Sequence, residues 1–168
     1  LASSACSATE GNLFVSRTDA GQAPHDAAAD AGGATDAMAA EGGVVQPGMR
    51  LQYQLTGALD QNADAELFVV DLFDTTPAQI AALHARGKVV VAYVSAGSFE
   101  RWRTDVKELP AAVIGNPLSS YPDEKWLDVR APSVRQLLRS RIDRAADKGF
   151  DGVLLVSLDG YLANTGHN

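Results

Sequence analysis

Residues Gly149–Tyr161 read GFDGVLLVSLDGY, and the apolar middle of this stretch predicts a buried strand. From Val153 to Leu158 every side chain except Ser157 is apolar, and Asp159 follows at once. A continuous apolar run is typical of a strand covered on both faces, as in a parallel sheet. An acid directly after such a strand is expected at the carboxyl end of the sheet, where α/β proteins build their sites.

Similar stretches occur earlier in the chain. ELFVVDLFD at Glu66–Asp74 is an apolar run that ends in two acids, and KVVVAYVSAGSFE at Lys88–Glu100 predicts a further buried strand. LQYQLTG at Leu51–Gly57 alternates apolar and polar residues before a glycine, which predicts a first strand. Residues 101–130 are interrupted by prolines and are expected to be irregular.

Two segments between these strands carry helix signals, TTPAQIAALHARG at Thr75–Gly87 and PSVRQLLRSRIDRAADKG at Pro132–Gly149. Thr76 and Gln79 have the spacing of a capping box, and Ser133 and Gln136 repeat that spacing in the second segment. The predicted apolar stripe of the second helix consists of Val134, Leu137, Leu138, Ile142, Ala145 and Ala146. Alternating strands and helices predict an α/β fold with a parallel sheet.

The N-terminal part of the chain has a different composition. Residues 1–50 carry six acids and two arginines, a net charge of −4 out of the −7 of all 168 residues. Because residues 1–48 are rich in Ala, Gly and Asp, they predict a flexible tether ahead of a domain at 49–168. The acidic balance argues against nucleic acid as a partner.

Cys6 closes the stretch LASSAC and is the single cysteine of the chain. Small residues that end in Cys before a polar tail resemble the lipobox of a bacterial lipoprotein, with Ser3 where that family usually has Leu. The resemblance implies lipidation of Cys6, a membrane contact through acyl chains only, and a location in the bacterial cell envelope. A free thiol in a secreted protein is the alternative.

The domain carries a series of motifs in a characteristic order: LQYQLTG, VVDLFDT, VAYVSAGSFERWRTD, EKWLDVR and GFDGV…DGY…NTG. From about Leu51 to Gly166 this series resembles the polygalactosaminidase family of glycoside hydrolases. The resemblance implies a (β/α) TIM-type barrel, of which these residues supply about the first half, and a substrate made of α-1,4-linked galactosamine.

The resemblance also implies which residues form the site. It implies a catalytic role for Asp159 and substrate binding by Gln54, Asp71, Tyr93, Ser95, Glu100, Arg103, Trp126, Asp128 and Tyr161, with Gly97, Trp102, Arg130 and Gly160 in the same motifs. Carboxylates at a strand mouth would attract a cationic amino-sugar polymer, and aromatic rings would contact its C–H surfaces.

Structural roles are open for several of these residues. Asp71 and Asp159 have the residue type that caps helices. Glu100 and Arg103 have the spacing of an ion pair. The two tryptophans, Trp102 and Trp126, are equally suited to packing.

One motif departs from the family pattern. Where the family reads E-P-D-N on the fourth strand, this chain has Leu154, Leu155, Val156 and Ser157. Glycoside hydrolysis needs two carboxyl groups, so Leu154 and Val156 predict impaired catalysis. Three explanations remain open: a piece of a longer enzyme, a carbohydrate-binding pseudoenzyme, or an interaction module that pairs with another chain and forms an oligomer.

No cofactor or metal is expected from the motifs. His25, His84 and His167 lack the spacing of metal ligands. A glycine-rich phosphate loop of the required form does not occur in the sequence.

Overall fold

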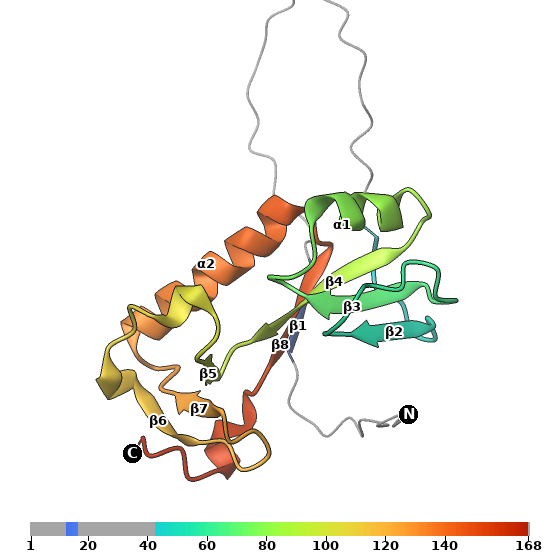
Figure 1. Ribbon diagram of the computed structural model, residues 1–168. Coiled ribbons are helices and arrows are strands. Elements are labelled where there is room, and N and C mark those ends of the chain that lie inside the picture. Colours follow the sequence, from blue (N-terminus) through green and yellow to red (C-terminus); the bar gives the residue numbers. More distant parts are fainter. Residues whose placement is uncertain (1–12, 17–42, 168) are drawn as a thin grey trace, which may run out of the picture.

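The computed structural model describes residues 13–16 and 43–167 (Figure 1). Its main sheet contains four parallel strands, β2 (Leu51–Gln54), β3 (Leu67–Asp71), β4 (Val89–Ser95) and β8 (Gly152–Val156), with the order β8-β4-β3-β2. Strands that follow one another in this way are the repeating unit of a (β/α) barrel. The predicted fold class is therefore confirmed, and the barrel is not closed among the described residues.

A fifth strand, β1 (Leu13–Ser16), runs antiparallel to β8 at the edge of this sheet. It lies inside the segment, residues 1–48, that the composition predicts to be a flexible tether. Three of its four residues, Leu13, Phe14 and Val15, are large apolar residues, and the strand pairs with residues 152–155 of β8. The rest of the predicted tether up to residue 42, including Cys6, lies outside the described residues.

Helices α1 (Pro77–His84) and α2 (Pro132–Lys148) pack on the same face of the main sheet (Figure 1). Their contacts form one apolar cluster with the strands, which includes Phe68, Val70, Ile80, Leu83, Val90, Ala92, Val94, Ala145 and Val153. The opposite face carries a smaller cluster of Val69, Val89 and Val91, with Tyr93 and Leu154 packed against it. Successive residues of each strand thus point to opposite faces of the sheet, and both faces carry packed apolar residues.

A second sheet contains β5 (Ser98–Glu100), β7 (Glu124–Leu127) and β6 (Ile114–Pro117), all antiparallel, in the order β5-β7-β6. Two 3-10 helices, η1 (Thr104–Val106) and η2 (Ala111–Val113), complete this region. The first half of α2 covers it through Val134 and Leu137. Residues 101–130, predicted to be irregular, therefore hold two short strands.

The predicted strand Lys88–Glu100 is in fact two strands that belong to different sheets. Ala96 N donates to Val156 O in the main sheet, and Gly97 O accepts from Leu127 N in the second sheet. The chain crosses between the sheets at Gly97, where a Cβ would lie 1.8 Å from the carbonyl oxygen of Ser157. Only glycine permits this close approach of two backbones.

The ends of the helices are partly as predicted. Thr76 and Gln79 form the capping box of α1, and Gly149 ends α2 in the left-handed region with φ 92°. The capping box predicted at Ser133 and Gln136 is wrong. Ala131 is the N-cap residue and Pro132 is the first helical residue, so Ser133 already lies within the helix.

The buried stripe of α2 also differs from the prediction at three positions, one of which is Ala146, predicted to be buried but exposed. Arg141 is buried with 1% exposure, whereas Ile142 is 38% exposed. The Arg141 guanidinium donates to both carboxylate oxygens of Asp105 in η1 and to the backbone oxygen of Ser95 at the end of β4. Hydrophobic periodicity does not identify this residue, because its burial depends on partners that are distant in the sequence.

The described part of the chain contains no helix that is both long and apolar enough to cross a bilayer. The predicted lipid anchor at Cys6 and the predicted location stay predictions.

Candidate functional site

A cavity of about 640 Å³ opens at the carboxyl ends of β3 and β4 and beside β5 and β7. Its lining consists of Leu55, Thr56, Asp71, Phe73, Asp74, Tyr93, Glu100, Trp102, Arg103, Thr104, Tyr121, Glu124, Arg144 and Ser157. We call it the strand-end cavity. It brings together four of the residues predicted to bind substrate, namely Asp71, Tyr93, Glu100 and Arg103.

Asp71, the last residue of β3, is held on two sides. Arg103 donates to its two carboxylate oxygens with N–O distances of 3.2 and 2.5 Å. The backbone N–H groups of Phe73 and Asp74 donate to Oδ1 at 2.8 and 3.0 Å. Asp71 therefore shapes the turn after β3 and is neutralised by a guanidinium at the same time, so it does not cap α1.

Glu100, the last residue of β5, is also buried against arginines. Arg103 Nε lies 3.4 Å from its Oε2, and Arg141 Nη1 lies 4.0 Å from the same oxygen. Burial raises the pKa of Glu100, which the two guanidiniums partly counteract. The ion pair with Arg103 that its spacing suggests is thus present.

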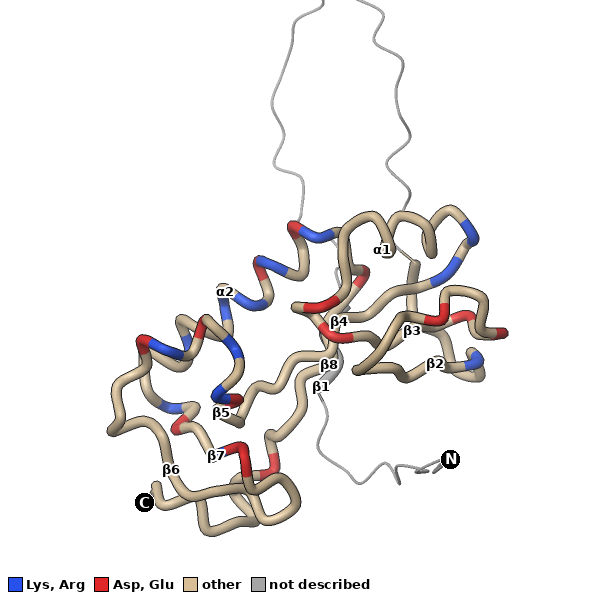
Figure 2. The backbone as a smooth tube through the Cα atoms, in the orientation of Figure 1, with Lys and Arg blue, Asp and Glu red and all other residues tan. Residues whose placement is uncertain are grey.

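Three guanidiniums surround one aromatic ring in this region. Those of Arg103, Arg141 and Arg144 lie 4.5, 5.3 and 4.8 Å from the centre of the Phe73 ring. Cation–π contacts of this kind hold cations at an apolar wall. Basic residues recur along the length of α2 (Figure 2), so this helix supplies two of the three arginines.

Glu124, the first residue of β7, is a site residue that the sequence interpretation missed. It lies directly opposite Glu100 in the β5–β7 pair. The buried hydroxyl of Ser98 donates to its Oε2 at 2.5 Å, and Ser98 is itself 2.5 Å from the Oγ of Ser95. The pairing of β5 with β7 would have revealed Glu124, but the short strands of the 101–130 segment give no clear periodicity.

Three aromatic residues, Tyr93, Trp102 and Tyr121, also line the cavity. Tyr93 has a raised pKa because of burial, with smaller contributions from Tyr53 and the nearby carboxylates. Trp102 and Tyr121 are 52% and 59% exposed, so their rings are accessible beside the cavity. Ser95 is buried below the lining and acts through Ser98.

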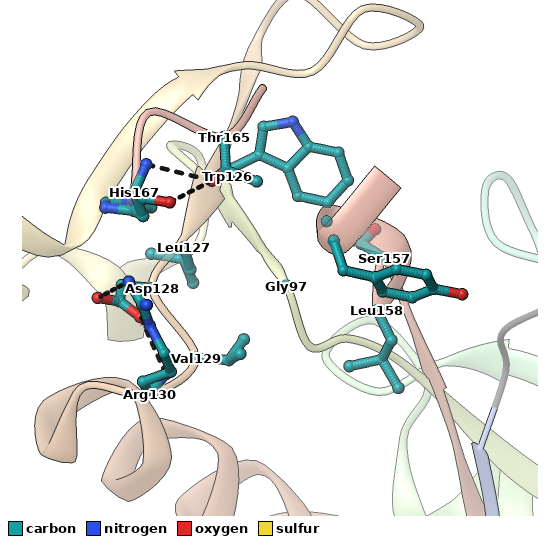
Figure 3. Close-up of a pocket in the computed structure, with 12 residues that line it drawn as sticks. Gly97, Trp126, Leu127, Asp128, Val129, Arg130, Ser157, Leu158, Thr165 and His167 are labelled. Carbon is teal, nitrogen blue, oxygen red and sulfur yellow. Dashed lines mark hydrogen bonds and ion pairs between the residues drawn. The ribbon is translucent and has the colours of Figure 1, made fainter. Parts of the chain in front are cut away.

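A second cavity of about 320 Å³ contains other predicted residues: Gly97, Trp126, Asp128, Arg130, Gly160 and Tyr161. In Figure 3, Asp128 and Arg130 lie on one side, Ser157 and Leu158 lie on the other, and Gly97 lies between them. Arg130 Nε donates to Asp128 at 2.8 Å, and its hydrogen bonds lower the pKa of Asp128. Trp126 is only 8% exposed, so its ring is mainly a packing group and offers little surface to a ligand.

Besides Ser95, two predicted residues lie in neither cavity. Gln54 fixes the turn after β2, because its side chain bonds to the backbone of Thr56, Ala58 and Asp60. Asp159 is exposed at the start of η3 (Asp159–Leu162), and Leu158 rather than Asp159 is the N-cap residue. A helix-capping role of Asp159 is therefore excluded.

Among the described residues, no group of three His, Cys, Asp or Glu side chains is arranged to hold a metal ion.

Residues 33–168 match the glycoside-hydrolase family GH114. The chain belongs to this family. The match begins within the predicted tether, ahead of the boundary that composition suggests at residue 49. None of the curated proteins matches the chain.

Solved structures agree with the GH114 assignment. Aspergillus fumigatus Ega3, solved in complex with galactosamine, is 41% identical, has a TM-score of 0.69, and is matched over 71% of this chain and 48% of its own. The glycoside hydrolase domain of PelA from Pseudomonas aeruginosa is 20% identical, with a TM-score of 0.59 over 67% and 46% of the two chains. At that identity PelA shows the fold alone. This GH114 chain thus spans about half the length of both structures.

The residues of β8 and Ser157, where the sequence departs from the family motif, are placed as follows by the fold. Leu154 packs against the Val69, Val89 and Val91 cluster on the face opposite the helices, beside Tyr93, and Val156 is 9% exposed. Ser157 follows with φ 60°, a backbone conformation that is rare for a residue other than glycine. It contributes to the lining of both cavities.

Proposed function

We propose that this GH114 chain binds a polymer of α-1,4-linked galactosamine in the strand-end cavity and hydrolyses it weakly or not at all. The observation that carries the proposal is the cavity itself, which combines carboxylates with two accessible aromatic rings at the ends of parallel strands. Carboxylates attract protonated sugar amines, and aromatic rings pack on the C–H surfaces of sugars. Ega3, a 41% identical protein, was solved with galactosamine bound.

The expectation of weak hydrolysis rests on β8. Apolar side chains stand at Leu154 and Val156, where the family motif carries acids, and an apolar side chain neither attacks nor donates a proton. Asp159 is the acid of this motif that remains, and it is exposed and lies outside both cavities. These positions favour a pseudoenzyme over an active hydrolase.

Binding and hydrolysis are tested separately on the same protein. Titration with an α-1,4-galactosamine oligomer is expected to shift the amide resonances of Tyr93, Glu100 and Trp102. Absence of any shift at millimolar oligomer contradicts the binding proposal. Release of reducing ends measures hydrolysis, for which we expect no signal above that of the buffer.

The variant Asp159→Asn decides the role of the remaining acid. If reducing ends are released by the wild type and lost in Asp159→Asn, the pseudoenzyme proposal is wrong and Asp159 is catalytic. If release is unchanged by the substitution, the chain is an enzyme whose carboxylates lie elsewhere.

A further inference from the structure

The carboxylates of the strand-end cavity differ in how far the protein already neutralises them. Asp71 accepts two hydrogen bonds from Arg103 and two from backbone N–H groups. Glu100 lies between Arg103 and Arg141. Both carboxylates are almost fully buried, with side-chain exposures of 5% and 8%. Both carboxylates are thus already paired with arginines of the protein.

Glu124 has a different environment. In the part of the chain that the structure describes, its carboxylate makes one hydrogen bond, to the Ser98 hydroxyl, and no ion pair. Oε2 is the oxygen bound by Ser98, so Oε1 is available to accept from a ligand. Glu124 is half-buried and contributes to the cavity lining.

The position of Glu124 is fixed by buried groups. Ser98 has no exposed surface, and its hydroxyl lies between the hydroxyl of Ser95 and carboxylate oxygen Oε2 of Glu124, 2.5 Å from each. Ser95 is 3% exposed, and its backbone oxygen accepts from Arg141. A carboxylate held by such a chain loses little conformational entropy when it binds a ligand.

The neighbour opposite Glu124 makes a cation favourable at this place. Like charges that face each other across a strand pair are destabilising, and Glu100 faces Glu124 in this way. Glu124 is among the causes of the raised pKa of Glu100, after burial. A ligand cation beside Glu124 would relieve this repulsion.

Aromatic rings lie on the same cavity. Tyr121 precedes Glu124 in the β6–β7 connection and Trp102 follows β5, and both rings contribute to the lining. A sugar ring that packs on either of them can direct an amino group toward Glu124. A carboxylate also distinguishes an ammonium group from an N-acetyl group, because the acetyl group removes the charge and two of the three N–H donors.

We propose that Glu124 is the specificity-determining residue that selects free amino sugars over their N-acetylated forms. The proposal rests on the function proposed above and assigns the selection to Glu124 rather than to Asp71 or Glu100. Asp71 and Glu100 instead hold Arg103 and the walls of the cavity in place.

The test compares two probes, an α-1,4-galactosamine oligomer and the same oligomer after N-acetylation, at a pH at which the free amines are protonated. Calorimetric titration of the wild type is expected to favour the free amine. Glu124→Gln, which still accepts from Ser98, is expected to weaken binding of the free amine about tenfold and to leave the acetylated oligomer unchanged. Glu124→Asp keeps the charge and is expected to show an intermediate preference.

Asp123→Asn is the matched control. It removes the same charge at the adjacent residue, but its side chain is 72% exposed, pairs with Arg101 and does not line the cavity. We expect its affinities to differ from the wild type by less than about twofold.

The possible failures are distinguishable. Failure of the wild type to bind either oligomer overturns both the proposed function and this inference. Binding of the wild type with the same preference in Glu124→Gln overturns this inference alone, as does an equal loss in Asp123→Asn. Unfolding temperatures of all variants show whether each protein is folded.

Discussion

Arg103 binds Asp71 through both carboxylate oxygens, although the two residues are 32 positions apart in the chain. The same guanidinium also contacts Glu100 and the ring of Phe73. The end of β3 is therefore joined to the segment that follows β5, and the wall of the strand-end cavity depends on this junction. A cationic side chain placed between two buried carboxylates is as much a structural element as a feature of the site.

Replacement of Arg103 is expected to destabilise the fold strongly. Arg103→Ala leaves Asp71 without its ion-pair partner and Glu100 with only the more distant Arg141, and breaking a buried ion pair typically costs about 3–5 kcal/mol. Urea denaturation measures the free energy of unfolding. Arg101→Ala is the control, because its ion pair with Asp123 is largely exposed and is expected to contribute less than about 1 kcal/mol. Equal losses of unfolding free energy in the two variants would contradict a stabilising role of the Arg103 ion pairs with Asp71 and Glu100.

The two helix starts provide a matched pair of substitutions. Thr76→Ala removes the side chain that accepts from Gln79 N, with an expected loss of about 1 kcal/mol in the free energy of unfolding. Ser133→Ala is expected to change it by less than about 0.5 kcal/mol, because the start of α2 has no side-chain cap. Thermal and urea unfolding measure the difference. A larger loss for Ser133→Ala than for Thr76→Ala would support the capping box predicted at Ser133.

Glu100 is expected to make stability fall as pH rises. Its pKa in the folded protein is raised above the model-compound value of 4.5, so in that range the folded state binds more protons than the unfolded state. The favourable contribution is complete below the unfolded pKa and is lost as pH rises through the folded pKa. Glu100→Gln should therefore show a more positive slope of unfolding free energy against pH than the wild type, starting near pH 4.5.

Urea unfolding at several pH values up to 7 measures this slope, and Glu108→Gln is an exposed control. Parallel curves for the wild type and Glu100→Gln would show that the carboxyl group of Glu100 titrates normally.

Gly97 is expected to tolerate no side chain. Gly97→Ala would place a Cβ 1.8 Å from the carbonyl oxygen of Ser157, and a backbone atom cannot move aside without shifting β8. Overpacking typically costs about 1–3 kcal/mol, and we expect the upper end or more here. Gly160→Ala is the control, because its Cβ would meet side-chain atoms of Thr165 and Trp126 at 3.3 Å, and these can adjust. A smaller loss for Gly97→Ala than for Gly160→Ala would contradict the close approach.

Local patterns predicted the elements of the main sheet well. The apolar runs before Asp71, Ser95 and Ser157 became β3, β4 and β8, and Thr76 with Gln79 starts α1 as expected. These features depend on residues that are close in the chain, so their periodicity is visible in it. The break at Gly97, the burial of Arg141 and the strands within residues 101–130 were missed, because each depends on a partner that is distant in the sequence.

The structure divides the predicted site residues between two cavities. Asp71, Tyr93, Glu100 and Arg103 meet in one cavity, whereas Trp126, Asp128 and Tyr161 line a second one. Gln54, Ser95 and Asp159 line neither cavity. Motif order identifies residues that belong to a family pattern, but it does not show which of them share a cavity.

By itself the sequence determined the alternation of parallel strands and helices, and it indicated the family through ordered motifs. Periodicity and motif order depend on residues that are close in the chain, so they can be recognised in the sequence alone. Only the tertiary structure decided which carboxylates are paired with arginines. Asp71 and Glu100 are neutralised by arginines of other elements, whereas Glu124 is fixed by a buried hydroxyl alone. Charge at a site depends on distances through space, because the Coulomb interaction and desolvation both depend on what the fold places nearby.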